Sequence, residues 1–204
     1  MKERIYLQGE RIGEFEIIEP LAAGSCAAIY RARRLTAGPA ADCALKISKF
    51  DMAALPASTR LELSARLHRE YVALSALDHP GVVEVHESGW YEGTAYYTME
   101  LLGGLTLAPY LAQKRRRYWE LMKVFLHLTE ALAHCHERGI IHRDIKPSNI
   151  LVEPERGPVL IDFGNCQPLI LNMLQPLTAP GAVLAGTGLP GPGGPFSTRG
   201  SLIS

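Results

Sequence analysis

The sequence lacks any excess of charge, because 21 lysines and arginines balance 21 aspartates and glutamates among its 204 residues. A chain without a basic surplus has no general attraction for nucleic acid or for an anionic membrane, so neither is predicted as a partner. The basic cluster at residues 114–117 precedes an amphipathic segment and is typical of a solvated surface turn. No secretory segment opens the chain, and no apolar run is long enough to span a bilayer.

Cysteine is also scarce, and no Cys-x-x-Cys pair occurs. Isolated cysteines suit a reducing environment better than disulfide bonding, so we predict a cytoplasmic protein with free thiols. The four positions are Cys26, Cys43, Cys135 and Cys166.

Residues 165–204 lack aspartate, glutamate and lysine, and Arg199 is their single charged residue. They are instead rich in glycine and proline, which interrupt regular structure. We therefore expect no packed element there, and we predict a disordered low-complexity tail at residues 188–204.

The most informative residues form two motifs. Residues 142–149 read His-Arg-Asp-Ile-Lys-Pro-Ser-Asn, and residues 162–164 read Asp-Phe-Gly. A phosphoryl group in transfer needs metal ions, a fixed cation and a carboxylate that orients the attacking hydroxyl. Asp144 would take the hydrogen of the hydroxyl, Lys146 would face the phosphate, and Asn149 and Asp162 would hold Mg²⁺, which prefers oxygen ligands.

These motifs resemble those of the eukaryotic-like, bacterial-type serine/threonine protein kinases. The lysine two residues after Asp144 is typical of the serine/threonine branch and is usually missing from aminoglycoside phosphotransferases, which share the fold. The resemblance implies that ATP and Mg²⁺ are the cofactors. It also implies that the γ-phosphate is transferred to a serine or threonine hydroxyl of a protein substrate.

A lysine and a glutamate in the first half complete the expected catalytic set. Residues 43–46 stand where the family has Val-Ala-Ile-Lys, so Lys46 would pair with the α- and β-phosphates of ATP. Residues 59–77 have the periodicity of an amphipathic helix, and Glu70 falls inside its apolar stripe. A carboxylate there needs a cation, and Lys46 is the natural partner. The alternative is that Glu70 reaches solvent from the edge of the stripe.

The glycine-rich loop departs most from the family pattern. Residues 22–29 read Ala-Ala-Gly-Ser-Cys-Ala-Ala-Ile, so only the middle glycine of three remains. Alanine cannot approach phosphates as closely as glycine, so we expect a stiffer loop and weaker ATP affinity or turnover. By resemblance, the residues that contact the rest of the nucleotide are Leu21, Gly24, Ile29, Ala44, Met99, Glu100, Leu102 and Leu151.

The remaining patterns predict an α+β, bilobal, protein-kinase-like fold. Short β-type runs occupy residues 13–50, and hairpins are expected at Glu92-Gly93 and around residues 155–157. A helix is expected at residues 121–138, with Gly139 as its stop. We assign residues 1–102 to a β-rich N-lobe with the hinge and residues 103–187 to an incomplete helical C-lobe that contains the start of the activation segment. The residues expected on one face of the second helix are Leu121, Phe125, Leu128, Leu132 and Cys135.

The resemblance extends from residue 13 to about Thr187 and then ends, because no Ala-Pro-Glu follows Gly186-Thr187. We expect a truncation or a shifted reading frame there, which would uncover the apolar face of the helix at residues 121–138 and favour a partner on it. Three interpretations remain open. The chain is a serine/threonine kinase impaired by truncation, a nucleotide-binding pseudokinase or interaction module, or a non-functional gene fragment.

Overall fold

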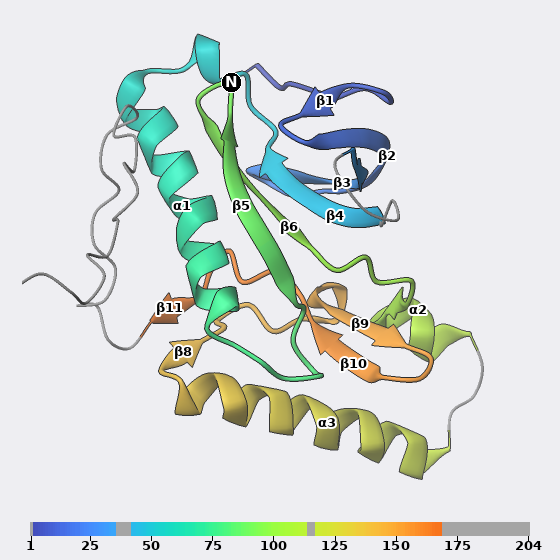
Figure 1. The fold of residues 1–204 in the computed structure, drawn as a ribbon. Helices are drawn as coiled ribbons and strands as arrows, with labels where there is room; N and C mark the ends of the chain where they lie inside the picture. The colour runs from blue at the N-terminus through green and yellow to red at the C-terminus, as the bar shows by residue number, and fades with distance from the viewer. Residues whose placement is uncertain (1, 36–41, 114–116, 169–204) are drawn as a thin grey trace, which may run out of the picture.

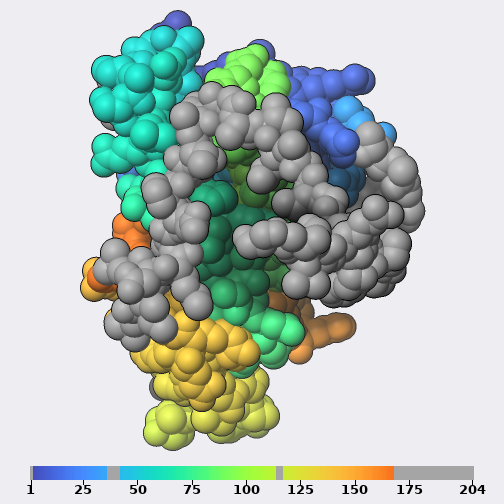
Figure 2. Space-filling model, turned by 60° about the vertical axis from the view of Figure 1, so that its left-hand side comes forward, coloured from blue at the N-terminus to red at the C-terminus, as the bar shows by residue number. Residues whose placement is uncertain are grey.

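The computed structural model describes residues 2–35, 42–113 and 117–168. The predicted tail at residues 188–204, the Gly186-Thr187 pair and most of the basic cluster at 114–117 lie outside these ranges. The described residues form a β-rich half with one long helix, followed by a second half with another long helix beneath it (Figure 1). In the space-filling view, the start of the first helix and the second helix lie at opposite ends of the molecule (Figure 2).

A six-stranded antiparallel sheet of order β1-β2-β3-β4-β6-β5 forms the first half. β4 and β6 are buried along nearly their whole length because apolar side chains on both of their faces meet a core. Alternate residues therefore belong to different cores: Ala44 and Tyr97 face one, whereas Leu45 and Tyr96 face the other. The strands are β1 (Arg11–Ile12), β2 (Phe15–Ala23), β3 (Ala27–Arg34), β4 (Asp42–Ser48), β5 (Val85–Tyr91) and β6 (Thr94–Met99).

The predicted hairpin at Glu92-Gly93 is confirmed. It joins β5 to β6 through two residues whose φ angles are 46° and 79°. Two consecutive left-handed residues match the twist of the flanking strands, which explains why glycine occupies the second position.

The first long helix, α1 (Ala57–Ser75), covers β5 and β6 and confirms the prediction of a helix near residues 59–77 (Figure 1). It starts after Pro56, and its buried side chains include Leu67, Glu70 and Leu74. The apolar stripe therefore packs on the sheet and carries Glu70 inward with it.

The second long helix, α3 (Tyr118–Glu137), starts three residues before the predicted boundary, and its predicted face is wrong in part. Phe125 is 54% exposed, and Leu121 and Leu132 are only half-buried. The helix is apolar on two adjacent stripes, so periodicity alone does not decide which of them packs against β8 and β10. The residues that are buried are Val124, Leu128, Ala131 and Cys135.

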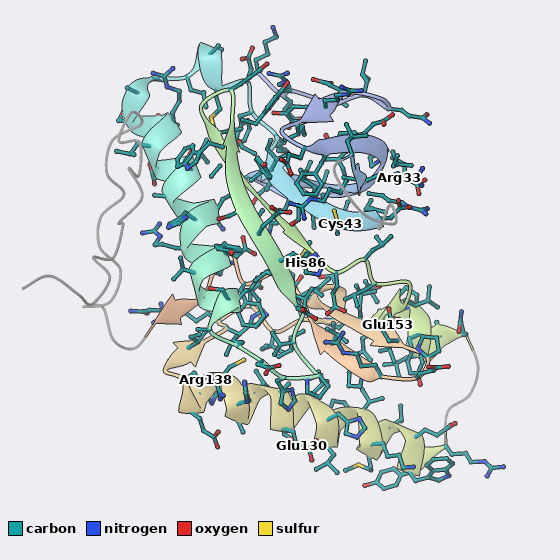
Figure 3. All side chains as sticks on the ribbon, viewed as in Figure 1. Arg33, Cys43, His86, Glu130, Arg138 and Glu153 are labelled. Carbon is teal, nitrogen blue, oxygen red and sulfur yellow. The ribbon has the colours of Figure 1, made fainter. Side chains whose placement is uncertain are left out.

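Short elements connect the helices and shape the lower half. The predicted hairpin around residues 155–157 is confirmed, with Gly157 at φ 88°. Glu153 extends from this hairpin toward the segment ahead of α2, where it accepts the backbone N–H of Gly104 (Figure 3). The elements are η1 (Met52–Ala54), β7 (Leu105–Thr106), α2 (Leu107–Ala112), β8 (Ile140–Ile141), η2 (Pro147–Asn149), β9 (Ile150–Glu153), β10 (Gly157–Leu160) and β11 (Gln167–Pro168).

None of the helices in the described ranges is both long and apolar enough to cross a bilayer. All four cysteines are described, and each is free. Burial raises the pKa of Cys43, Cys135 and Cys166 to about 11, so these thiols stay protonated at neutral pH.

The face of α3 can be tested with two truncations. Leu128→Ala should lower the free energy of unfolding by about 2–5 kcal/mol, because it empties a site that is 6% exposed. Phe125→Ala is the matched control on the neighbouring stripe, and it should change stability by only about 0.5 kcal/mol. Urea denaturation measures both. Equal losses would show that the two stripes are buried alike.

Candidate active site

A cavity of about 500 Å³ lies between the β2–β3 hairpin, α1 and the segments at residues 144–149 and 161–165. Its lining draws on both halves of the chain. Eight of the predicted site residues contribute to it: Gly24, Ile29, Lys46, Glu70, Asp144, Lys146, Asn149 and Asp162.

Lys46 lines the cavity and contacts two carboxylates. Its Nζ is 2.6 Å from Oε1 of Glu70 and 2.9 Å from Oδ1 of Asp162. Glu70 is only 3% exposed, so the alternative in which it reaches solvent from the edge of the stripe is wrong. Three distant segments, β4, α1 and the residues after β10, therefore meet through one ammonium group.

The ionisation of this cluster follows from burial and pairing. Burial alone would lower the pKa of Lys46, but Glu70 and Asp162 outweigh burial and raise it. Burial raises the pKa of Glu70, and Lys46 offsets part of that rise. The pKa of Asp162 would also rise on burial, but the neighbouring Lys46 brings it below its ordinary value. Lys46 and Asp162 therefore form an ion pair at neutral pH.

Asp162 has a left-handed backbone conformation, with φ at 62°. Arg143 has φ at 64°, and Glu92 in the hairpin is the other non-glycine residue with a positive φ among the described residues. Such conformations cost about 1–3 kcal/mol and persist where the surroundings impose them, often at functional sites. Asp162 lines the cavity, and Arg143 precedes Asp144, which also lines it. Two of the three left-handed residues therefore lie at the cavity.

The residues after β8 hold Asp144 in a network of short polar contacts. Its Oδ2 accepts from Lys146 Nζ at 2.7 Å and from Asn149 Nδ2 at 3.1 Å. The same Nδ2 donates to the backbone carbonyl of Asp144 at 2.9 Å. The hydrogen bond from Lys146 is the main reason that the pKa of Asp144 lies below its ordinary value, and the bonds from Asn149 and Asn165 lower it further. The carboxylate is thus ionised and able to accept a proton.

The buried side chain of His142 contacts both the loop of Asp144 and the segment around Phe163. Its ring packs on Phe163 with the ring centroids 4.5 Å apart, and it lies within hydrogen-bond distance of the Ile161 carbonyl and the Asp144 N–H. Burial lowers the pKa of His142, so the ring is neutral at pH 7 and one nitrogen can accept while the other donates. The histidine therefore links the loop of Asp144 to the segment of Asp162.

The oxygen donors in the cavity fit magnesium. The amide nitrogen of Asn149 donates to Asp144, its amide oxygen accepts from Ser148 at 3.4 Å and keeps a second lone pair for a metal, and Asp162 supplies a carboxylate. In the part of the chain that the structure describes, no three His, Cys, Asp or Glu side chains form a metal-binding group. Two protein oxygens suit an ion that keeps waters and takes its other ligands from phosphates.

Six predicted nucleotide residues lie outside the lining of the cavity: Leu21, Ala44, Met99, Glu100, Leu102 and Leu151. Ala44 and Met99 are buried and paired across β4 and β6, and Leu21 is 46% exposed. The N–H of Glu100 donates to the Glu84 carbonyl at 2.9 Å, so only its carbonyl group could serve an adenine.

Arg156 binds Glu100, at the start of the segment that joins the two halves of the chain. Its Nη1 donates to both carboxylate oxygens of Glu100, at 2.7 and 2.6 Å, and its Nη2 donates to the Val82 carbonyl at 2.8 Å. Glu100 also accepts the N–H of Glu84 at 2.8 Å. The β9–β10 turn is thereby tied to the strands above it.

The glycine-poor loop is a closed hairpin between β2 and β3. The N–H of Gly24 donates to the Ala27 carbonyl at 2.8 Å. Neither Ala22 nor Ala27 has a positive φ, so alanine fits both positions without backbone strain. The hairpin therefore accommodates both alanines.

Arg66 and Asn165 are among the cavity residues that sequence reasoning missed. Arg66 lies one helical turn before Glu70, and this spacing alone would have placed it on the same face of α1. Asn165 follows the Asp-Phe-Gly motif directly, but its position depends on the unusual backbone at Asp162, which no pattern in the sequence signals.

Comparisons with known proteins match most of the chain. The family model of the protein kinase domain matches residues 15–175. The serine/threonine-protein kinase PrkC of Bacillus subtilis is 32% identical over 160 residues, which cover 78% of this chain and 24% of PrkC. The serine/threonine-protein kinase PknF of Mycobacterium tuberculosis is 34% identical over 167 residues, which cover 77% of this chain and 33% of PknF.

Solved structures show the same fold. A single-site mutant of the kinase domain of M. tuberculosis PknI matches with a TM-score of 0.62 and 25% identity, over 79% of this chain and 63% of that one. The apo form of PpkA-294 matches with a TM-score of 0.67 and 27% identity, over 78% and 62%. The chain spans about a quarter to a third of the length of the curated relatives named above.

Proposed function

Because this chain belongs to the protein kinase family, with a bacterial-type serine/threonine kinase domain, we propose that it transfers the γ-phosphate of ATP to a serine or threonine hydroxyl of a protein. One observation carries the proposal: Lys46 contacts Glu70 and Asp162 at the same time, within the cavity that also holds Asp144. The Lys46 ammonium group, the carboxylates of Glu70, Asp144 and Asp162, and the Asn149 amide thus line one cavity that is large enough for phosphates.

The proposed roles follow from charge and position. Asp144 is ionised and orients the substrate hydroxyl, accepting its proton as the hydroxyl oxygen bonds to the γ-phosphorus and the bond from that phosphorus to the ADP oxygen breaks. Lys146, whose Nζ lies beside that carboxylate, neutralises charge on the transferred group. Lys46 binds the α- and β-phosphates and is held in place by Glu70. Asn149 and Asp162 would hold Mg²⁺, which supplies further positive charge to the phosphates.

The residues of the adenine pocket remain part of this proposal. The side chains that would enclose the base are Leu21, Ile29 and Ala44 from the sheet, Met99 before the hinge and Leu151 below. The backbone groups of Glu100 and Leu102 would hydrogen-bond to it. We likewise propose that residues 1–102 form the nucleotide-binding lobe and residues 103–187 part of the substrate lobe. The free cysteines support a reducing compartment, and we place the domain in the cytoplasm.

Transfer of labelled γ-phosphate from Mg-ATP to a generic basic protein tests the proposal. Label should appear on serine or threonine of the acceptor, and phosphoamino-acid analysis identifies which. An acceptor that stays unlabelled after prolonged incubation with a large amount of the chain would contradict it.

The second candidate is a nucleotide-binding pseudokinase or interaction module, favoured by two observations. Alanine replaces glycine at positions 22 and 27, and α3 exposes a stripe of large apolar side chains that a partner would cover. In this case the cavity binds nucleotide without turnover, and α3 carries the interaction. The exposed stripe consists of Tyr118, Trp119, Met122, Phe125 and Leu126.

Both candidates predict that the metal binds together with the nucleotide. With only two protein oxygens for the ion, Mg²⁺ alone should leave the Tm almost unchanged. Mg-ATP at a hundredfold excess over its Kd should add ~2.7 kcal/mol of stability, or a rise in Tm of about 5–10 °C. Thermal denaturation with Mg²⁺, ATP and both together measures this. Asp162→Asn should reduce the part of the rise that depends on Mg²⁺, and the absence of any shift would contradict both candidates.

A further inference from the structure

Arg66 uses its guanidinium group to join three segments of the cavity wall. Nε donates to the carbonyl of Gly164 at 3.1 Å, and Nη2 donates to Oδ1 of Asn165 at 2.9 Å. Nη1 lies 3.5 Å from Sγ of Cys26 at the tip of the β2–β3 hairpin. One side chain of α1 therefore contacts both the residues after Asp162 and the loop above the cavity.

Asn165 passes this contact on to Asp144. Its Oδ1 accepts from Arg66, and its Nδ2 donates to Oδ2 of Asp144 at 3.4 Å. An amide that accepts from a cation becomes a better donor, because successive hydrogen bonds polarise one another. At 3.4 Å this bond is longer than the contacts of Asp144 with Lys146 and Asn149.

The orientation of Asp144 depends on which of its oxygens is engaged. Lys146, Asn149 and Asn165 all donate to Oδ2, so within the described residues the side-chain hydrogen bonds of Asp144 are made by that oxygen and not by Oδ1. Lys146 and Asn149 belong to the same loop as Asp144, whereas Asn165 approaches from the Asp-Phe-Gly segment. Asn165 is therefore the donor that fixes the carboxylate relative to the segment of Asp162.

The backbone at Gly164 is closely surrounded by the side chains of the Lys46 cluster and by Arg66. A Cβ atom at residue 164 would lie 3.2 Å from Oδ1 of Asp162, 3.6 Å from Oε2 of Glu70 and 3.8 Å from Nη2 of Arg66. The backbone of the segment thus fits closely between the Lys46 cluster and Arg66.

We propose that Arg66 and Asn165 are positioning residues, which form a relay from α1 to Asp144 and fix the carboxylate that orients the substrate hydroxyl. The inference rests on the proposed kinase function. It adds a physical link between the placement of α1 and the geometry of Asp144, separate from the Lys46–Glu70 pair. Neither residue contacts the reacting atoms, so each acts through the groups it holds.

The decisive variant is Asn165→Asp. It keeps an acceptor for Arg66, and even gains an ion pair, but it replaces the donor toward Asp144 with a carboxylate oxygen that repels it. We expect the Tm to be unchanged or higher, kcat to fall about 10- to 100-fold and KM for ATP to stay nearly constant, since small displacements of a reacting group have effects of that size. A residue with only a structural role would lose no activity in this variant, so wild-type kcat would overturn the relay.

Three further variants complete the kinetic test. Asn165→Leu removes both bonds and should lower kcat as well. Arg66→Lys, which keeps the charge, should retain more of kcat than Arg66→Gln. Arg60→Gln is the matched control on an exposed position of the same helix and should leave kcat unchanged. Equal kcat for Arg66→Lys, Arg66→Gln and the wild type would contradict the proposal.

Two double-mutant cycles in thermal stability need no turnover, so they separate failure of the relay from failure of the proposed function. One cycle pairs Arg66→Gln with Asn165→Leu, and the other pairs Asn165→Leu with Asp144→Ala. In each, the double variant should lose less Tm than the sum of the single losses, because contacting residues are coupled. Additive losses in both cycles would overturn the relay, whether or not the wild type transfers phosphate.

Discussion

Asp144→Asn should lower kcat for phosphate transfer by about 10²–10⁴-fold while leaving the Kd for Mg-ATP nearly unchanged. The asparagine keeps the size of the side chain and can still accept from Lys146 and Asn149, but it cannot take the proton of the substrate hydroxyl. Asp144 is ionised in the structure because Lys146 holds its pKa low, so the substitution removes a group that is ready to act.

The measurement is label transfer under single-turnover conditions, with nucleotide binding followed by thermal shift. Asp78→Asn, at an exposed position after α1, is the matched control and should behave as the wild type does. A kcat within a few-fold of the wild-type value in Asp144→Asn would remove Asp144 from the mechanism. A parallel loss of Mg-ATP binding would instead indicate that the substitution disturbs the whole loop.

Lys46→Met should lower the free energy of unfolding by about 3–5 kcal/mol, a large share of the stability of an ordinary domain. The substitution leaves Glu70 buried at 3% exposure without its cation, and it also removes the partner of Asp162. Urea denaturation at pH 7 measures the loss. Lys2→Met is the matched control, because Lys2 is 78% exposed and its ion pair with Asp51 spans 3.7 Å. It should cost no more than ~1 kcal/mol.

The loss in Lys46→Met should shrink in acid. Burial raises the pKa of Glu70 in the folded state above its unfolded value, and without Lys46 this rise is larger. Stability linked to a raised pKa is fully present below the unfolded pKa and is lost as the pH rises through the folded one. The variant should therefore lose more stability at pH 8 than at pH 5. A second substitution, Glu70→Leu, should recover part of the loss, and a double variant as unstable as Lys46→Met would contradict this account.

The sequence predicts the Lys46–Glu70 contact because two independent signals converge on it. One is the motif that ends in Lys46, and the other is a charged residue inside the apolar stripe of α1, which must find a counter-charge once it is buried. The hairpins at Glu92-Gly93 and Gly157 are predictable for a similar reason, since glycine marks the left-handed turn positions.

The packed face of α3 was harder to predict because the helix offers two apolar stripes, and only the partner elements decide between them. Phe125 and Leu128 are equally apolar in the sequence, but Leu128 faces the core and Phe125 faces outward. The relay through Asn165 was not predictable at all. It depends on the left-handed backbone at Asp162 and on a contact with Arg66, which lies 99 residues earlier in the chain.

The hydrogen bonds of Arg156 with Glu100 restrict how the two halves of the chain can move apart. The guanidinium group donates to both carboxylate oxygens of Glu100 and to the Val82 carbonyl. These bonds hold the start of the segment that joins the two halves against the β9–β10 turn. Motion of one half relative to the other must therefore turn about Glu100 or break these hydrogen bonds. Gly104, further along the chain, is also held, because its N–H donates to the Glu153 side chain of β9.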